Sequence, residues 1–505
     1  MSRTTPLLLF SCFCLLAGDM LYGYDTISFG GMLANPGFIA RFAPYHAAAK
    51  THVFDSLHTS LLSSMPFIGK FIGCFLAGPA IERVGHRMVF WLLSAVSIIG
   101  VLIEITSASG NQGRYAQFLV GRIIVYASIG MVEVNITTYQ AEIVPAPLRG
   151  LVVVSMQLFL TAGGVIATGI NKAFANTHTD AGWQTVTGIQ FLFPFLIATF
   201  TYFIPNSPRW LLSKDREDEA TTALRRLRSP DEVAAGNCEA EISAIKEALQ
   251  ENMHKGSWRA LVQGTNLRRT ALVIVYYFFQ QTTGQAFVST YQTTFYKTNG
   301  FAAEAFTYPI ITTCLGMLAV VPAMYLVDTL GRRATLLQSY VFQALWLFIL
   351  AGLGSKTVRT ATQDNAIVAS FMLFAVFYNL GSASIPYLLG AEIPNAALRE
   401  KTQAIGASWN VVWAFVTNFI IPYMINSIHF KVGWVFGGIS ALALVFTFFF
   451  LPETKALALE EIDALFSVSF NPFIKTDIPL TTVQRRIGYF EGEDDKDATK
   501  FVETA

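Results

Sequence analysis

Amide side chains recur along one apolar stretch of this chain, residues 273–296, which reads VIVYYFFQQTTGQAFVSTYQTTFY. Steps of four, four and three residues separate Gln281, Gln285, Ser289 and Gln292, and Gln280 precedes them. Such spacing places the four on one face of a helix. An amide both donates and accepts hydrogen bonds, which suits the neighbouring hydroxyls of an uncharged, polyhydroxylated ligand. Polar side chains also join helices within a membrane, but a stripe of four favours a binding site.

Ionisable side chains interrupt other apolar stretches. Asp19 and Asp25 are six residues apart in the first, and Arg122 and Glu133 share a later one. Each isolated charge at mid-membrane costs about 3 kcal/mol, so we expect these groups to be paired. For Glu133, contact with a substrate and a role in packing remain equally open.

The elements that must position these residues are membrane-spanning helices. Hydrophobic residues make up 53% of the 505 residues and charged residues only 14%, compared with about 25% charged residues in a soluble domain. Twelve apolar stretches are long enough to cross roughly 30 Å of hydrocarbon, and each must be a helix. They are 7–33, 57–80, 88–107, 115–140, 150–171, 186–205, 270–297, 305–328, 333–353, 366–392, 400–425 and 432–451. The first resembles a signal peptide at its start, but it continues without a cleavage site, so a retained helix is expected.

Polar segments divide the chain. We expect a first half at 1–205, a linker at 206–269, a second half at 270–451 and a tail at 452–505. In the linker, apolar residues recur at helical spacing, which predicts short amphipathic helices; they are Ala220, Ala223, Leu224 and Leu227. The tail is acidic and poor in apolar residues, which is typical of disorder.

Basic residues alternate between loops and concentrate on the side of the linker, so both termini are expected to be cytoplasmic.

A net charge of +1 does not indicate a nucleic-acid partner. The five cysteines show no paired framework and read as small buried hydrophobes; they are Cys12, Cys14, Cys74, Cys238 and Cys314. No metal or cofactor is expected, and no nucleophile–base pair that would suggest an enzyme stands outside the apolar stretches.

Three charged motifs occur twice. AEIVPAPLRG at 141–150 returns as AEIPNAALRE at 391–400, and ERVGHR at 82–87 returns as DTLGRR at 328–333. A weaker pair is IPNSPRW, from Ile204, and LPETK, from Leu451. The nearly constant offset indicates two tandem halves of six helices, and an even number of helices makes the repeat parallel.

These repeated charges predict a salt-bridged cytoplasmic gate that holds the two halves together. Glu142 can meet Arg83 and Arg87, and Glu392 can meet the arginines at 332 and 333. Partly exposed pairs are weak, which suits contacts that break in every cycle. A role as topology anchors would explain the arginines but not the glutamates. The expected gate comprises Glu82, Arg83, Arg87, Glu142, Arg149, Arg209, Asp328, Arg332, Arg333, Glu392, Arg399 and Glu453.

Together the motifs are specific. They are GYDT (23–26), ERVGHR, GR (121–122), YQAEIVPAPLRG (139–150), PNSPRWL (205–211), QQTTGQ (280–285), DTLGRR, GAEIPNAALREKT (390–402) and PETK (452–455). From about residue 15 to 465 the chain resembles the sugar porters of the major facilitator superfamily. The run at 390–402 and FYKTNG (295–300) are more like fungal transporters of the alpha-glucoside and oligosaccharide type. The resemblance implies an all-α membrane protein with twelve transmembrane helices in two six-helix parallel pseudo-repeats, a short cytoplasmic helical linker and a monomeric state in the plasma membrane.

The resemblance also implies a sugar pocket. Gln280 and Gln281 match the pocket glutamines, Gln157 matches a sugar-binding glutamine and Asn410 a pocket asparagine; Gln285 comes from the polar stripe. Several hexose contacts differ: Ala286 and Gly316 replace asparagines, Asn379 replaces an acid and Tyr387 a tryptophan. With Asn379 and Tyr387 included in the pocket, a disaccharide, an oligosaccharide or another non-glucose sugar is the expected substrate.

In proton-coupled sugar porters, the residues that match Asp25 and Arg122 form a pair, whereas uniporters commonly carry asparagine at the first position. Asp25 therefore favours import by proton symport. Facilitated diffusion, transport of a quinate-like or glycosylated metabolite in either direction, and sugar sensing remain alternatives. The sequence differs from the family at one position of the gate: Asn206 replaces the glutamate that the family has there, which removes one carboxylate.

Overall fold

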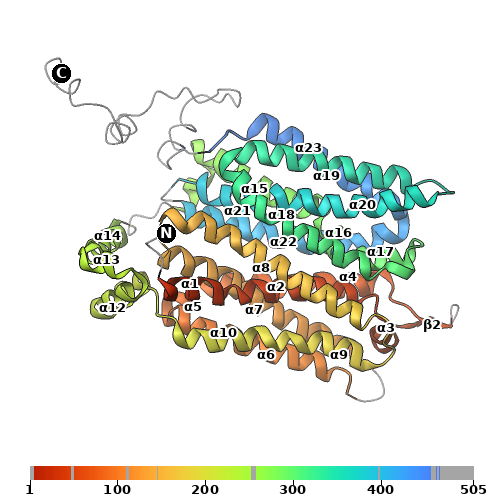
Figure 1. Ribbon diagram of the computed structural model, residues 1–505, viewed down its shortest axis with the longest axis horizontal. Helices are drawn as coiled ribbons and strands as arrows, with labels where there is room; N and C mark the ends of the chain where they lie inside the picture. Colours follow the sequence, from red (N-terminus) through yellow and green to blue (C-terminus); the bar gives the residue numbers. More distant parts are fainter. Residues whose placement is uncertain are drawn as a thin grey trace.

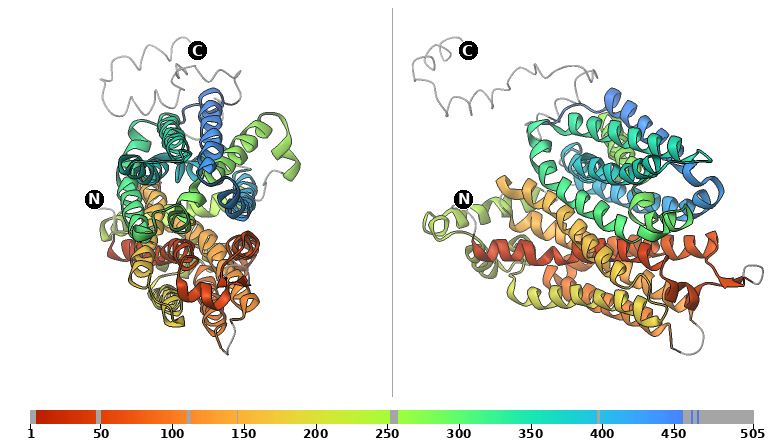
Figure 2. Two further views of the ribbon diagram at one scale, coloured as in Figure 1. Left: turned by 90° about the vertical axis from the view of Figure 1, so that its right-hand side faces the viewer. Right: turned by 45° about the vertical axis from the view of Figure 1, so that its right-hand side comes forward.

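Long helices of the computed structural model run side by side in an elongated bundle (Figure 1). The structure describes residues 5–46, 50–109, 113–144, 146–251, 257–395, 398–455, 462 and 466. Figure 2 shows the N-terminal half (red to yellow) and the C-terminal half (green to blue) next to one another in both views. We call the end of the bundle that carries α12, α13 and α14 the linker end, and the opposite end, with β1 and β2, the loop end.

The N-terminal half contains ten α-helices, one 3-10 turn and a β-hairpin whose two strands have two residues each. These elements are α1 (Pro6–Leu15), α2 (Ala17–Met32), α3 (Pro36–Phe42), β1 (Tyr45–His46), β2 (Thr51–His52), α4 (Ser56–Ser64), α5 (Pro66–Val84), α6 (His86–Thr106), α7 (Tyr115–Ile143), α8 (Ala146–Ala173), α9 (Asp180–Gly188), η1 (Ile189–Phe191) and α10 (Leu192–Phe203). In the antiparallel hairpin, Tyr45 pairs with His52.

The C-terminal half repeats this plan with more interruptions. Its elements are α15 (Gly264–Thr282), α16 (Gln285–Ser289), α17 (Gln292–Thr298), η4 (Ala302–Glu304), α18 (Thr307–Thr329), α19 (Arg332–Gly354), α20 (Ala361–Phe377), the π-helical turn η5 (Tyr378–Ser382), α21 (Ile385–Glu392), α22 (Arg399–Ile428), η6 (His429–Lys431) and α23 (Val432–Phe450).

Helices occupy all twelve of the apolar stretches. Within the described residues, nine segments are long and apolar enough to cross a membrane, and one of them, Lys401–Phe450, contains both α22 and α23. The stretches of α8 and of α15 to α17 fall outside those nine. The first stretch is divided at Leu16, between α1 and α2.

Glycines allow the helices of the N-terminal half to approach closely. A Cβ at Gly69 would lie 1.9 Å from the carbonyl oxygen of Ile123, and one at Gly73 would lie 2.0 Å from that of Ala127. Because lipid gives helices no hydrophobic reason to associate, such small residues at the contact are what bring α5 and α7 together.

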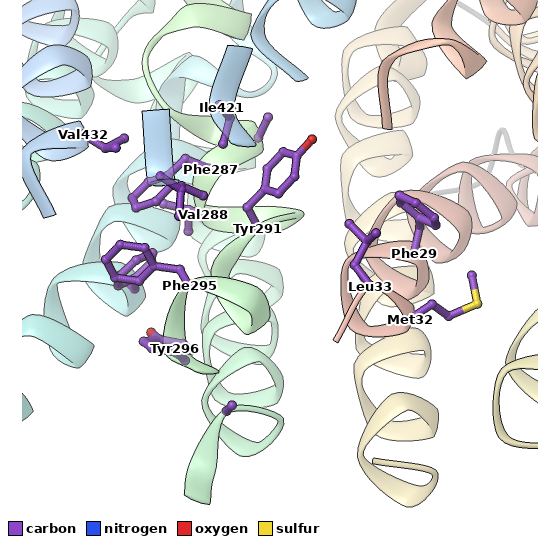
Figure 3. Packing of buried hydrophobic residues seen from close by; sticks show 14 of the residues in the cluster. Phe29, Met32, Leu33, Phe287, Val288, Tyr291, Phe295, Tyr296, Ile421 and Val432 are labelled. Atoms are coloured by element: carbon purple, nitrogen blue, oxygen red, sulfur yellow. The ribbon is translucent and has the colours of Figure 1, made fainter. Parts of the chain in front are cut away.

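Near the loop end, apolar side chains from both halves form one buried cluster (Figure 3). From the end of α2 and the residue after it, the cluster includes Phe29, Met32 and Leu33, and from the seventh stretch it includes Phe287 and Phe295. The two halves therefore share a packed core at this end.

Short helices form the linker, as the spacing of its apolar residues predicts. They are α11 (Pro208–Leu212), α12 (Glu217–Leu227), α13 (Pro230–Ala234), α14 (Asn237–Glu251) and the 3-10 turn η3 (Trp258–Val262). The four apolar residues singled out on α12 are all buried.

Two hydrogen bonds join the end of α12 to the N-terminal half. Arg228, after α12, binds Glu241 at 2.6 Å and donates to the carbonyl oxygen of Ile143 at the end of α7, at 3.0 Å. Thr5 donates to the carbonyl oxygen of Leu227 at 3.0 Å.

Candidate substrate and proton sites

The seventh stretch is not one helix, so the expectation of an uninterrupted polar face there is wrong. Gly284 has φ +107, a left-handed conformation that favours glycine, and it separates α15 from α16. A Cβ at this position would also lie 3.1 Å from Cβ of Phe436 in α23. A second interruption follows at 290–291, between α16 and α17, so regular helical spacing does not hold across 281–292.

Three of the expected pocket residues form a hydrogen-bonded chain. Gln281 donates to Oδ1 of Asn410 at 3.1 Å, and Asn410 donates to Oε1 of Gln280 at 2.7 Å. Gln280 in turn donates to the carbonyl oxygen of Ala383 at 2.6 Å. Since Gln280 and Asn410 are buried and Gln281 is partly exposed, Gln281 is the member of this chain that can exchange its bond for one to a ligand.

A second pair of expected pocket residues joins the two halves. Gln157 of α8 donates to Oδ1 of Asn379 at 3.0 Å, and Asn379 donates to the carbonyl oxygen of Ala375 at 2.9 Å. Asn379 lies in the π-helical turn η5, where the extra residue per turn is a frequent feature of functional sites.

The remaining pocket candidates make other contacts. Gln285 donates to Oγ of Ser289 at 3.1 Å, within α16. Tyr387 of α21 donates to Oε1 of Glu133 in α7 at 3.4 Å, a second bond between the halves. The structure therefore brings Gln280, Gln281 and Asn410 together and does not join Gln285 or Tyr387 to them by a hydrogen bond.

Glu133 belongs to a charged cluster that the sequence reading missed. Its Oε2 lies 2.8 Å from Nζ of Lys70 in α5, a lysine that is only 1% exposed. The ammonium also lies 4.2 Å from the ring centroid of Tyr22, a cation–π contact. Lys70 is a single charge within the second apolar stretch, and that isolation was the feature that could have identified it.

Asp25 and Arg122 form an ion pair inside the N-terminal half. Nη2 of Arg122 lies 3.1 Å from Oδ2 of Asp25, and each residue is 1% exposed. Gln190 of η1, which the sequence reading did not single out, donates to Oδ1 of Asp25 at 2.8 Å. The guanidinium lies 3.6 Å from the ring centroid of Phe29. Because neither charge reaches water, removing one partner would leave the other uncompensated.

At the linker end of the C-terminal half, the expected gate residues form a compact network. Arg332 binds Glu392 at 2.9 Å and Asp328 at 3.1 Å. Glu453 accepts hydrogen bonds from the backbone N–H groups of Arg332 and Arg333, at 2.9 and 3.1 Å, and so caps the start of α19. A Cβ at Gly331 would lie 2.5 Å from Oε2 of Glu453, so this approach requires glycine.

The N-terminal half is built differently, and the expected contact of Glu142 with Arg83 and Arg87 is wrong. Glu142 accepts hydrogen bonds from Nε2 of His86, at 3.1 Å, and from the hydroxyl of Ser207. Arg87 donates instead to two backbone carbonyl oxygens of α10, and Arg83 is exposed. His86 occupies the repeat position of Arg332, and it therefore takes the carboxylate.

His86 has a hydrogen-bond acceptor at each ring nitrogen. Its Nδ1 lies 2.8 Å from Oδ1 of Asn135, whose amide nitrogen donates to the backbone carbonyl oxygen of His86. That second bond fixes the orientation of the amide, and the other acceptor is Glu142. The contact of His86 with Glu142 thus takes the place, in the N-terminal half, of the contact between Arg332 and Glu392.

The other gate candidates are placed as follows. Glu82 is exposed, and its carbonyl oxygen accepts from Trp210. Arg209 lies in α11 and Arg399 begins α22. The side chain of Arg149 lies outside the described part of the chain. Asn206 has a buried Oδ1 for which the described residues provide no donor.

Each gate pair joins helices of the same half, so the expectation that they hold the two halves together is wrong for this conformation. Among the described residues, no ion pair crosses between the halves at the linker end. Besides the bonds of Gln157 and Tyr387 described above, two hydrogen bonds join the halves at the loop end: Ser60 donates to the carbonyl oxygen of Phe419 at 2.6 Å, and Asn426 to Oγ of Ser56 at 2.8 Å. With the packed cluster there, these bonds close the loop end.

Comparison with known proteins agrees with the motifs. The family model described as "Sugar (and other) transporter" matches residues 11–466. The high-affinity glucose transporter ght5 of Schizosaccharomyces pombe is 28% identical over 92% of this chain and 85% of its own length. The high-affinity gluconate transporter ght3 of the same yeast is 28% identical over 95% and 87%. The MFS transporter fmqE of Aspergillus fumigatus is 29% identical over 89% and 84%.

Solved structures show the same fold. The proton:xylose symporter XylE with a bound bromodeoxyglucose aligns with a TM-score of 0.74 at 22% identity, over 91% of this chain and 99% of XylE. The inward-open form of XylE from E. coli aligns with a TM-score of 0.75 over the same shares. The predicted major facilitator fold of twelve helices with a helical linker is confirmed.

Proposed function

Because the chain belongs to the sugar transporter family of the major facilitator superfamily, we propose that it imports a sugar by proton symport through alternating access. Transport in place of enzymatic activity follows from the family and from the relatives. The proton coupling, the direction of transport and the choice of sugar are the proposed parts. The observation that carries the coupling is the buried ion pair between Asp25 and Arg122.

A buried carboxylate that is paired with an arginine can convert proton binding into a change of conformation. In the present state the opposite charges of Asp25 and Arg122 cancel, and Gln190 donates a hydrogen bond to the second carboxylate oxygen. Protonation of Asp25 would remove its charge and release Arg122, which would change the balance between the two conformations. XylE, which is described as a proton:xylose symporter, shares the fold.

We propose that the substrate lies between the halves and contacts the amides on both sides of that boundary. Gln281 and Gln157 are partly exposed and can donate to sugar hydroxyls, and Asn379 and Asn410 hold them in place. The proposed pocket consists of Gln157, Gln280, Gln281, Gln285, Asn379, Tyr387 and Asn410. The relatives are named for glucose, gluconate and fructose, but the changes at Ala286, Gly316 and Asn379 favour a disaccharide, an oligosaccharide or another non-glucose sugar here.

The closed loop end supports an inward-facing conformation. In this proposal the linker end and both termini are cytoplasmic, and the protein works as a monomer in the plasma membrane. The helix boundaries support a division into halves at 1–205 and 270–451, a linker at 206–269 and a tail at 452–505. In the outward-facing state, the gate residues of the two halves would approach one another at the linker end.

Uptake of labelled sugars in transport-deficient cells tests the proposal. The panel includes glucose, fructose, xylose, gluconate, maltose and cellobiose, each at two external pH values and with or without a protonophore. Accumulation that rises at acidic pH and collapses with the protonophore supports symport. Uptake that is unaffected by both treatments would make the protein a facilitator, and preferential loss of preloaded sugar would make it an exporter.

A further inference from the structure

Glu104 is a buried carboxyl group that lacks a hydrogen-bond partner. It lies near the loop end of α6, its exposure is 1%, and in the described part of the chain neither Oε1 nor Oε2 accepts a hydrogen bond. The hydroxyl of Ser107 binds the backbone carbonyl oxygen of Glu104, not the carboxyl group. The adjacent helix α7 packs tightly against it, since a Cβ at Gly121 would lie 2.6 Å from Cγ of Glu104.

Gly121, against which Glu104 packs, directly precedes Arg122 in α7, so Glu104 lies next to the segment that carries the arginine of the proposed proton site. Asp25 of α2 and Arg122 of α7 both interact with Glu104 electrostatically. Arg122 itself has unused capacity, because its Nε and Nη1 are buried and find no acceptor among the described residues. Gln190, which holds Asp25, likewise has a buried Oε1 without a donor in that part of the chain.

This site therefore contains two carboxyl groups and one guanidinium. If both carboxyl groups were ionised, the interior of the bundle would carry a net negative charge that no water solvates. One bound proton makes the three groups neutral. Two carboxyl groups that compete for one proton and one cation titrate as a pair, so the proton belongs to the pair and not to Asp25 alone.

We propose that Glu104 is a second proton-carrying residue of the transport cycle, which exchanges a proton and the Arg122 guanidinium with Asp25. In the conformation described here, Asp25 is ionised and paired, and Glu104 holds the proton as a carboxylic acid. When Asp25 takes up the proton, the O–H bond of Glu104 breaks and that of Asp25 forms. Arg122 then turns its unused Nε and Nη1 towards the new carboxylate. The number of protons and the net charge of the three groups stay constant during this step.

The inference rests on the proposed symport, but its first test does not measure transport. Infrared spectra of the purified protein in lipid at neutral pH distinguish a protonated carboxyl group from a carboxylate. The difference spectrum between the native protein and Glu104→Gln should contain a carboxylic acid carbonyl band, which shifts upon exchange into D₂O. Glu104→Asp, which retains a carboxyl group, should keep such a band but at a shifted position. If the native protein and Glu104→Gln show no difference in that region, Glu104 holds no proton and the inference is wrong.

The second test is the pH dependence of sugar uptake. Glu104→Gln removes the internal proton donor, and protonation of Asp25 then leaves the site with the positive charge of Arg122, so the midpoint of uptake should move about one pH unit towards acid. Glu247→Gln, at an exposed carboxylate of α14, should leave both the spectrum and the midpoint unchanged. An unshifted midpoint in Glu104→Gln, with pH-dependent uptake intact, would contradict the inference alone.

The outcomes also separate this inference from the proposed function. If uptake by the native protein ignores the proton gradient, symport fails whatever the infrared spectrum shows. Sugar binding and elution as a single species in size-exclusion chromatography show whether Glu104→Gln has folded. If Glu104→Gln has not folded, the infrared band of Glu104→Asp is compared with that of the native protein. A band unchanged in position and intensity would exclude position 104 as its source.

Discussion

The amide of Asn379 lies directly in front of Gly316: a Cβ at Gly316 would be 3.0 Å from its Nδ2. The same Asn379 accepts the hydrogen bond from Gln157 across the boundary between the halves. Two departures from the hexose transporters, at 316 and 379, are therefore in contact. The missing side chain on α18 gives room for the amide on η5, so the polar group of this part of the pocket comes from a different helix.

Gly316→Ala should weaken substrate binding. The added methyl group would displace the Asn379 amide by a few tenths of an ångström and disturb its bond to Gln157. Loss of one such bond is worth about 0.5–1.5 kcal/mol, so the dissociation constant should rise roughly threefold to tenfold. Calorimetric titration of purified protein measures it. Gly438→Ala is the matched control, because no atom lies within 4 Å of a Cβ there. Equal affinities for both variants would show that the amide takes no part in binding.

Asp25→Asn should abolish accumulation of sugar against a gradient and leave exchange partly intact. The amide cannot take up the coupling proton, although it can still hydrogen-bond to Gln190. The measurement is concentrative uptake together with counterflow in proteoliposomes. A mutant that still accumulates sugar would exclude Asp25 as the coupling acid and would make Asp19 or Glu133 the candidate.

Gln281→Ala should weaken sugar binding more than Gln292→Ala. Gln281 is partly exposed and joined to Asn410, whereas Gln292 is buried at the start of α17, beyond the break at Gly284. The expected rise in the dissociation constant for Gln281→Ala is roughly threefold to tenfold. Direct binding to purified protein is needed, because uptake combines affinity with gating. A reversed order would place the sugar nearer the loop end.

Arg332→Ala should slow transport with little change in affinity for the substrate. Arg332 contacts Glu392 and Asp328 at the linker end and none of the proposed pocket residues. Single-turnover transport and equilibrium binding separate the two effects. Normal turnover combined with lost binding would contradict the role of this network in the conformational cycle.

The helices and their repeat could be predicted because both leave local traces in the sequence. Membrane helices need about twenty apolar residues each, and the repeated motifs mark equivalent helix ends. Residues that are distant in sequence could be paired only through the resemblance, as for Asp25 and Arg122. Gln190 could not be identified from the sequence, because it belongs to none of the motifs and a single glutamine at a helix junction is not distinctive.

The errors have physical causes. At the break, Gly284 lies against Phe436, which is 152 residues away in the chain, and spacing alone could not reveal this contact. Arg83 and Arg87 were expected at Glu142 because they belong to the repeated charged motif, but His86, at the repeat position of Arg332, binds Glu142 instead. Lys70 and Glu104 were visible as isolated charges, but the partner of Lys70, Glu133, and the helix that packs against Glu104 are distant in the sequence.

The bonds from Arg228 to Ile143 and from Thr5 to Leu227 fix α12 to the N-terminal half. As the two halves rock against each other, α12 should travel with α7 as one rigid body. A spectroscopic probe on α12 and a second probe on the linker end of α19 would then report the angle between the halves directly. Such a pair of probes would follow the cycle in real time without any label near the sugar or the proton.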